Sequence, residues 1–346
     1  MSRAPALVAG LLLLAAAPPR AAAAPSGTDR IHERSIVVMG TRVTLTMWTD
    51  DEALAAAAAQ RAFDEFRRLD KLMSLWIPDS DVLRINAAAG VAPVAVSDDT
   101  LAVMRVAAAV SRASGGAFDV TVGAFHGLWK FDQDVDGTIP DKAAVLARKK
   151  LVNWRDVVID DQKKTVFLRR KGMAINLGGV AKGYAVDKAR PLIERDGLSD
   201  YILRAGGDLY VSGRHGARQW VVGIRDPRGP AEDSFAAAAL ENCTFSTSGD
   251  YERFVVKDGV RYHHILDPKT AYPAWKSRSV TVMARDATTA DAWSKPLFIL
   301  GPVDGMKLLA KVPGLEAVWV DDKNQVTVSA GLKDKLKILH PPTPGI

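Results

Sequence analysis

A glycine pair followed by a lysine offers the clearest chemistry in this sequence. Gly178 and Gly179 precede Lys182 in the run 175–187, which follows a β-like segment over 165–175 and leads into a helical pattern. Glycines at a strand-to-helix junction let the backbone approach a ligand closely, and the helix N-terminus adds free N–H groups and a positive dipole end. The lysine adds a cation. This combination suits a phosphate or pyrophosphate, although a tight structural turn with a solvated lysine explains the same residues.

Polar residues gather at five other predicted loops, most of them beside glycine. These clusters are Met39–Thr41, Trp76–Asp81, Ala117–Gly123, Ser246–His264 and Ala290–Lys295. Polar side chains on loops suit recognition of a polar ligand. Trp76 is open to two interpretations, because a lone tryptophan either fills the core or offers an aromatic platform beside a ligand. The run 117–123 likewise fits either a ligand loop or a structural turn between helices.

Composition places the chain among globular proteins. Its 346 residues are 48% hydrophobic and 25% charged, which is enough for a sizeable core. The formal charge of +6 comes from Lys and Arg scattered among acids, without a basic stripe that carries interleaved aromatic residues, and this argues against nucleic-acid binding. Cys243 is the only cysteine, so it cannot pair within the chain.

The first 24 residues have the pattern of a secretory signal peptide. Arg3 precedes an apolar run over 6–18, and an alanine run ends at Ala24. The apolar run is too short to span a bilayer comfortably, so cleavage is expected near Pro25. No cysteine follows the run to carry a lipid anchor. We therefore expect a periplasmic or otherwise exported protein, soluble after cleavage and not a lipoprotein.

The mature region, 25–346, alternates strand and helix patterns without an internal repeat or a low-complexity linker. Strands are expected within 35–48, 165–175, 201–212, 220–224, 235–240, 279–284 and 317–328. Helices are expected over 51–72, 82–86, 98–114 and 289–300. Residues 132–144 are expected to form a surface excursion, and Asp258-Gly259 is expected to be the turn of a hairpin. This order predicts one continuous α+β domain.

The polar clusters carry an ordered set of motifs that resembles the ApbE family, the FAD:protein FMN transferases. The motifs, in chain order, are MGT, PDSD-x4-N, GGAFDVTVG with a following LW, LGGVAKGYAVD, GGD, STSGDYE, HHILDP and TADA. The resemblance covers nearly all of the mature chain. It implies an ApbE-like, T-fold-related domain that binds FAD and transfers FMN to a Thr or Ser hydroxyl of an acceptor protein, with release of AMP.

The same resemblance assigns site residues. It implies that FAD is contacted by Met39, Trp76, Ala117, Phe118, Asp119, Asn176, Lys182, Ser248 and Ile265. It implies that Asp291 is catalytic. It also implies that one Mg²⁺ is held by the carbonyl of Gly179, by Asp291 and by a threonine four residues after Asp291. The ion would neutralise charge on the leaving phosphate. His264 matches a candidate general base for the acceptor hydroxyl. A core histidine hydrogen-bonded to backbone is its structural alternative.

Two positions depart from the family pattern. Lys295 occupies the position of the threonine ligand, and lysine donates hydrogen bonds only and is cationic, so it cannot coordinate Mg²⁺. Either Lys295 turns away and water completes the metal shell, or its ammonium replaces the ion and pairs with Asp291 or the pyrophosphate. Ala271 stands where the DPxTG pattern has glycine.

These departures leave three functions open. The first is the transferase, whose acceptor is a Thr- or Ser-bearing subunit of a membrane or periplasmic redox complex. The second is an FAD-binding protein that lost catalysis through Lys295. The third is an FAD pyrophosphatase that yields FMN and AMP. A homodimer is compatible with each of them.

Overall fold

The computed structural model describes residues 30–346, so the expected signal peptide over 1–24 lies outside the described residues. Its centre is an eight-stranded sheet in which neighbouring strands run antiparallel. In spatial order these strands are β1 (Ile31–Val38), β2 (Thr41–Trp48), β6 (Tyr201–Ala205), β7 (Asp208–Ser212), β10 (Cys243–Gly249), β13 (Ser277–Ala284), β14 (Glu316–Asp321) and β15 (Val326–Val328). Within residues 30–346, no helix is both long enough and apolar enough to cross a bilayer.

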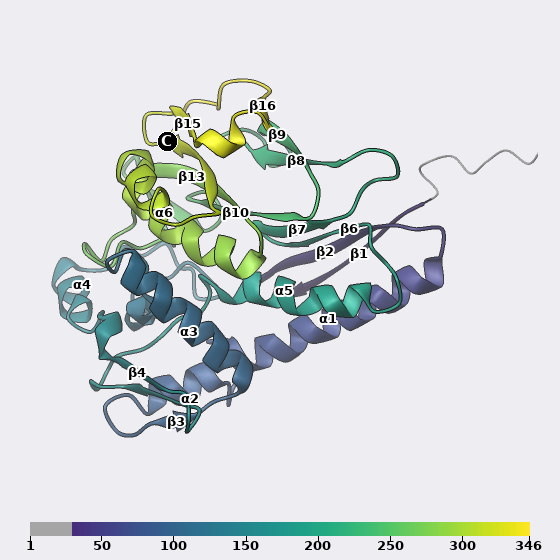
Figure 1. Ribbon diagram of the computed structural model, residues 1–346. Helices are drawn as coiled ribbons and strands as arrows, with labels where there is room; N and C mark the ends of the chain where they lie inside the picture. The colour runs from purple at the N-terminus through teal and green to yellow at the C-terminus, as the bar shows by residue number, and fades with distance from the viewer. Residues whose placement is uncertain (1–29) are drawn as a thin grey trace, which may run out of the picture.

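Helices α1, α5 and α6 cover one face of this sheet (Figure 1). The six helices described are α1 (Glu52–Met73), α2 (Asp81–Ala87), α3 (Asp98–Ala113), α4 (Lys142–Lys149), α5 (Ala181–Glu194) and α6 (Ala287–Leu309). Asp51, Ser97 and Asp286 each accept a backbone N–H of the first turn that follows, which explains where α1, α3 and α6 begin. Helix α6 is kinked at Gly301, whose φ is 71°.

A smaller sheet covers the other face of the large one, in the upper part of Figure 1. It consists of β16 (Leu336–Ile338), β9 (Ser234–Leu240) and β8 (Trp220–Arg225). Phe245 of β10 packs there against Trp220 and Phe235 in a core separate from the main one beneath the helices. The remaining strands are β3 (Val94–Ala95), β5 (Thr165–Leu168) and β4 (Val157–Asp160) in one sheet, and the hairpin β11 (Phe254–Lys257) and β12 (Val260–His263).

The predicted α+β architecture is confirmed, with two local differences. Strand β5 ends at Leu168 instead of continuing to residue 175, because the chain turns at 169–172 and Gly172 there adopts a φ of 86°. Helix α4 begins within the stretch expected to be a surface excursion. Asp141 starts it by accepting the N–H groups of Ala143 and Ala144.

The start of helix α5 packs closely against helix α6 at Gly183. A Cβ added there would collide with the carbonyl oxygen of Ala287 and lie 2.6 Å from Cβ of Asp291. We expect Gly183→Ala to lower the free energy of unfolding by about 1–3 kcal/mol, because the helices would have to separate. Urea unfolding measures this, with Lys188→Ala on the exposed side of the same helix as the control. Equal stability of the two variants would contradict the close contact.

Candidate active site

A cavity of about 660 Å³ lies where the loops expected to be functional meet, and this volume is typical of ligand sites. Its lining includes the following residues named from the sequence: Met39, Trp76, Ala117, Phe118, Asp119, Asn176, Gly179, Lys182, Ser248, His264, Ile265 and Lys295. Asp291 is fully buried behind this lining and reaches it through ion pairs with Lys182 and Lys295. The fold therefore gathers residues from 39 to 295 around one cavity.

Two lysines and two buried aspartates form a chain of alternating charge in the cavity wall. Lys182, in the first turn of α5, places its Nζ 3.2 Å from Oδ2 of Asp208 and 3.8 Å from Oδ2 of Asp291. Lys295, one turn after Asp291 in α6, donates to Oδ1 of Asp291 and to its backbone carbonyl oxygen. Lys182 also donates to the carbonyl of Gly178 at 3.0 Å. Two ammonium groups thus flank one carboxylate beside the glycine pair.

The charge states of this chain follow from burial and from the neighbouring charges. Burial raises the pKa of Asp208, and the adjacent Asp291 raises it further. Burial also disfavours ionisation of Asp291, but Lys182 and Lys295 outweigh it and bring the pKa of Asp291 below its ordinary value. Burial opposes the charge of Lys182, yet the two carboxylates raise its pKa overall. Asp291 and Lys182 are therefore both ionised at neutral pH.

The residues at the expected magnesium position do not fit a divalent ion as they are arranged. Oδ1 of Asp291 accepts from the ammonium of Lys295, and Oδ2 accepts from the backbone N–H of Gly183 at 2.9 Å. A Cβ added to Gly179 would lie 3.6 Å from Cε of Lys295, so the lysine stem passes beside this glycine. The ammonium group stands among the oxygen atoms that a metal would need, and lysine has no lone pair to give when charged. Of the two alternatives for Lys295, the structure shows the one in which it pairs with Asp291.

The two adjacent histidines have different surroundings. Nε2 of His263 lies 2.9 Å from the carbonyl oxygen of Ala274, and this ring is completely buried. His264 lines the cavity, and its buried Nδ1 has no hydrogen-bond partner among residues 30–346. Burial and the positive charges around it, including Arg253, keep the pKa of His264 well below 6.5. His263 is thus the histidine bonded to backbone, and the neutral imidazole of His264 lines the cavity.

Two residues expected to contact FAD accept hydrogen bonds from backbone N–H groups around the cavity. Oδ1 of Asp119 accepts from the N–H and the hydroxyl of Thr121, and Oδ2 accepts from the N–H of Trp154. Oδ1 of Asn176 accepts from the N–H of Gly178. Both side chains line the cavity, and their bonds fix the loop after helix α3 and the glycine turn. These hydrogen bonds help to shape the cavity, and the FAD contacts expected for Asp119 and Asn176 stay predictions.

The aromatic edge of the cavity is formed by Trp76 and His126. Their rings meet edge to face with centroids 5.0 Å apart, and Trp76 is 39% exposed. Trp76 is therefore not core filler, the alternative considered from the sequence.

Ala271, where the family pattern has glycine, adopts a φ of 68°, a conformation that alanine rarely takes. Its backbone N–H still donates to the carbonyl oxygen of Asp267 at 2.7 Å.

Sequence reasoning assigned no role to several charged residues of the cavity, among them Asp208 and Arg253. Asp208 is the last residue of the GGD motif, so its position was noticed, but the motif did not predict its contacts. In the structure Asp208 pairs with Lys182 and accepts a hydrogen bond from the hydroxyl of Ser246. Arg253 forms an ion pair with Asp132 and donates to the carbonyl of Gly40 at 2.9 Å. It therefore ties together three segments at the cavity.

These observations define a mixed α+β protein with a charged cavity built around a glycine pair. The sequence profile of the ApbE family matches residues 39–319, and the chain belongs to this family. A relative from Klebsiella pneumoniae, named FAD:protein FMN transferase, is 31% identical over 303 residues, which are 87% of this chain and 93% of the relative. A relative of the same name from Treponema pallidum is 33% identical over 331 residues, which are 90% of this chain and 91% of the relative.

A solved structure shows the same fold. The ApbE protein of Thermotoga maritima is 32% identical to this chain and superposes with a TM-score of 0.79, covering 88% of this chain and 99% of that protein. The predicted family and its fold are thereby confirmed.

Proposed function

We propose that this protein transfers FMN from FAD to a Thr or Ser hydroxyl of an acceptor protein, releasing AMP, and that the ammonium of Lys295 stands in place of a divalent metal ion. The names of the relatives support the transfer reaction. Transfer without a divalent metal ion is supported by one observation, the pair of lysines on either side of Asp291. Both lysines line the cavity together with Gly178 and Gly179.

The proposed reaction is a displacement at phosphorus. The acceptor oxygen bonds to the phosphorus on the flavin side of FAD, and the bond from that phosphorus to the bridging oxygen breaks, so that AMP leaves. The hydroxyl proton passes to the imidazole of His264, which lines the cavity. Lys182 and Lys295 stabilise the negative charge that develops on the pyrophosphate oxygens.

We expect chelation with EDTA to leave transfer by the wild-type protein unchanged. In EDTA, Lys295→Thr should lower the rate by roughly 10²–10³-fold, because one cation at the leaving phosphate is lost. Added Mg²⁺ should restore part of that rate, since threonine and Asp291 then offer oxygen ligands. The measurement follows AMP, free FMN and protein-bound flavin, and calorimetry with Mg²⁺ alone reports metal binding separately.

Lys307→Thr, at an exposed position of the same helix, is the matched control and should behave like the wild type. Loss of wild-type transfer in EDTA would refute the metal-independent form. AMP and free FMN without bound flavin would instead identify a pyrophosphatase, and intact FAD under all conditions a binding protein.

We further propose that transfer takes place outside the cytoplasm, on a subunit of a membrane or periplasmic redox complex. The support is the signal-like pattern of residues 1–24. Expression of the full chain with a C-terminal tag, followed by fractionation and N-terminal sequencing, tests this. Recovery in the cytoplasm with Met1 retained would contradict export.

A further inference from the structure

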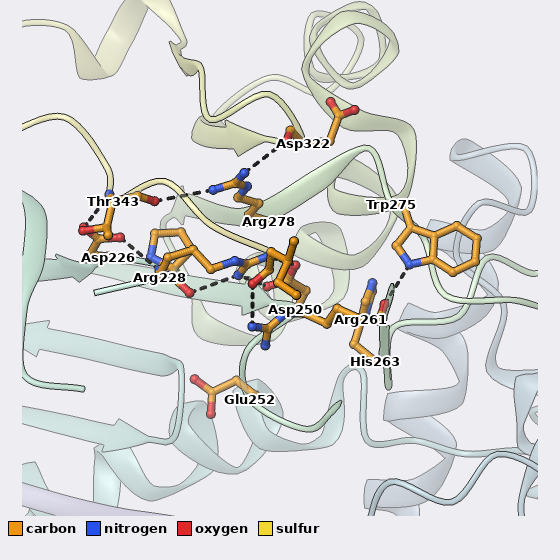
Figure 2. A network of polar contacts seen from close by, with 12 residues as sticks. Asp226, Arg228, Asp250, Glu252, Arg261, His263, Trp275, Arg278, Asp322 and Thr343 are labelled. Carbon is orange, nitrogen blue, oxygen red and sulfur yellow. Dashed lines mark hydrogen bonds and ion pairs between the residues drawn. The ribbon is translucent and has the colours of Figure 1, made fainter. Parts of the chain in front are cut away.

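The hairpin of β11 and β12 borders the cavity at the end where its two strands meet the rest of the chain. Arg253 precedes β11 and His264 follows β12, and both residues line the cavity. The backbone N–H of His264 donates to the carbonyl oxygen of Arg253 at 3.1 Å. Asp250, just ahead of β11, forms a two-pronged ion pair with Arg228, with both N–O distances at 2.7 Å, and Figure 2 shows this pair. The hairpin is therefore fixed at its cavity end.

The outer edge of β12 is occupied by a neighbouring segment of the same chain. The carbonyl oxygen of Arg261 accepts a hydrogen bond from the indole N–H of Trp275 at 2.9 Å, which Figure 2 shows as a dashed line. Just beyond the strand, the N–H of Ala274 donates to the carbonyl oxygen of Ile265 at 3.0 Å. A further strand beside β12 would have to displace these bonds.

The outer edge of β11 is open. Arg253 and His264 form a hydrogen-bonded pair, so the alternation of antiparallel pairing turns the backbone N–H and C=O groups of Phe254 and Val256 away from β12. None of these outward groups forms a hydrogen bond within residues 30–346. Phe254 is 40% exposed and Val256 is 45% exposed. An edge strand with free backbone groups and exposed apolar side chains is a template on which another chain can pair.

We infer that the acceptor protein binds here, by adding an extended segment as a third strand along the outer edge of β11. The inference rests on the proposed transferase function, because that reaction brings a second polypeptide to His264. Strand addition of this kind gains affinity from backbone hydrogen bonds and specificity from alternate side chains. A β-branched or other apolar acceptor residue fits beside the exposed side chains of Phe254 and Val256.

The geometry also limits where the reacting hydroxyl lies in the acceptor. Strand β11 begins at Phe254, and the residue before it, Arg253, already lines the cavity. A strand advances about 3.3 Å per residue, so the acceptor Thr or Ser lies roughly one to three residues beyond the paired stretch. One hairpin thus joins the docking edge to the imidazole of His264, which takes the proton.

The first experiment measures hydrogen–deuterium exchange in the full chain without FAD, so that no transfer takes place. The probe is the purified, flavin-free subunit that the transfer assay labels. Its addition should slow the exchange of the N–H groups of Phe254 and Val256 by about tenfold or more, because they become hydrogen-bonded. The N–H of Gly314, at an exposed turn elsewhere in the chain, should exchange as before.

The second experiment measures the kinetics of Val256→Pro. Proline removes the outward N–H and leaves the hydrogen bonds between β11 and β12, which do not use it. The KM for the acceptor should rise about tenfold or more, whereas kcat and the affinity for FAD should match those of the wild type. Val256→Thr, the matched control, keeps the N–H and a β-branched side chain, so its KM should stay close to the wild-type value.

Two results would overturn the docking and leave transfer in place: unchanged exchange at both N–H groups, or an unchanged KM in Val256→Pro. Protection that follows the concentration of this chain and not that of the acceptor would identify a second copy as the occupant, and would overturn the docking too. Failure of the wild type to label any subunit would refute the transferase function, and the docking with it. If Val256→Pro does not fold, the exchange measured in the wild type decides.

Discussion

Replacement of His264 by glutamine should lower the rate of FMN transfer by roughly 10²–10⁴-fold, the range that a positioned general base contributes. The imidazole of His264 lines the cavity, and the amide of glutamine cannot take up a proton in its place. Because burial keeps the pKa of His264 well below 6.5, the wild-type imidazole is already neutral at pH 6.5 and above. The measurement is single-turnover formation of protein-bound flavin at saturating FAD.

Binding of FAD distinguishes a lost base from a damaged cavity. The affinity of His264→Gln for FAD should match that of the wild type, since only the step that removes a proton is affected. His32→Gln, on strand β1 and outside the cavity lining, is the control and should transfer FMN normally. A wild-type rate in His264→Gln would remove this residue from the mechanism.

The second large effect is expected for Lys182→Met. Lys182 is the cation that lies between Asp208 and Asp291, and both aspartates are almost completely buried. Its removal should lower the free energy of unfolding by about 3–5 kcal/mol, because a buried carboxylate loses its partner. Transfer should fall by roughly 10²–10³-fold, because one of two cations at the pyrophosphate is gone. Chemical denaturation and the transfer assay measure the two effects.

A double variant separates these two contributions. Lys182→Met with Asp208→Asn removes both members of the pair, so stability should largely return while transfer stays low. Lys188→Met, an exposed lysine of the same helix that lies 3.6 Å from Asp99, should change stability by less than about 1 kcal/mol. Recovery of transfer in the double variant would show that Lys182 acts only by neutralising Asp208.

Much of the fold could be predicted because its signals are local. The helices expected over 51–72 and 98–114 correspond to α1 and α3, and the strands expected within 35–48 correspond to β1 and β2. Asp258-Gly259 joins strands β11 and β12 as expected. Each of these features depends on neighbours within a few residues, so one sequence contains the whole signal.

The arrangement of the site could be predicted only in part. The motifs named the residues, but the pairing of Lys182 with Asp208 joins helix α5 to strand β7 and depends on how the sheet and helices pack. The same is true of Arg253, which reaches Gly40 across 213 residues. For Lys295, the residue type alone predicted the chemical conflict with a metal ion, and the packing of α6 beside Gly179 determined that it pairs with Asp291.

The close contact at Gly183 also bears on how the site opens. The backbone N–H of Gly183 donates to Asp291. One hydrogen bond therefore joins the contact between α5 and α6 to the charged centre, the group of two lysines and two aspartates in the cavity wall. Lys182, Asp208, Asp291 and Lys295 all belong to helices or strands of the main body rather than to its loops. Local fluctuations of surface loops leave such elements intact, and they separate only in the least frequent, most extensive openings of a protein. This charged centre is thus lost together with the fold and not before it.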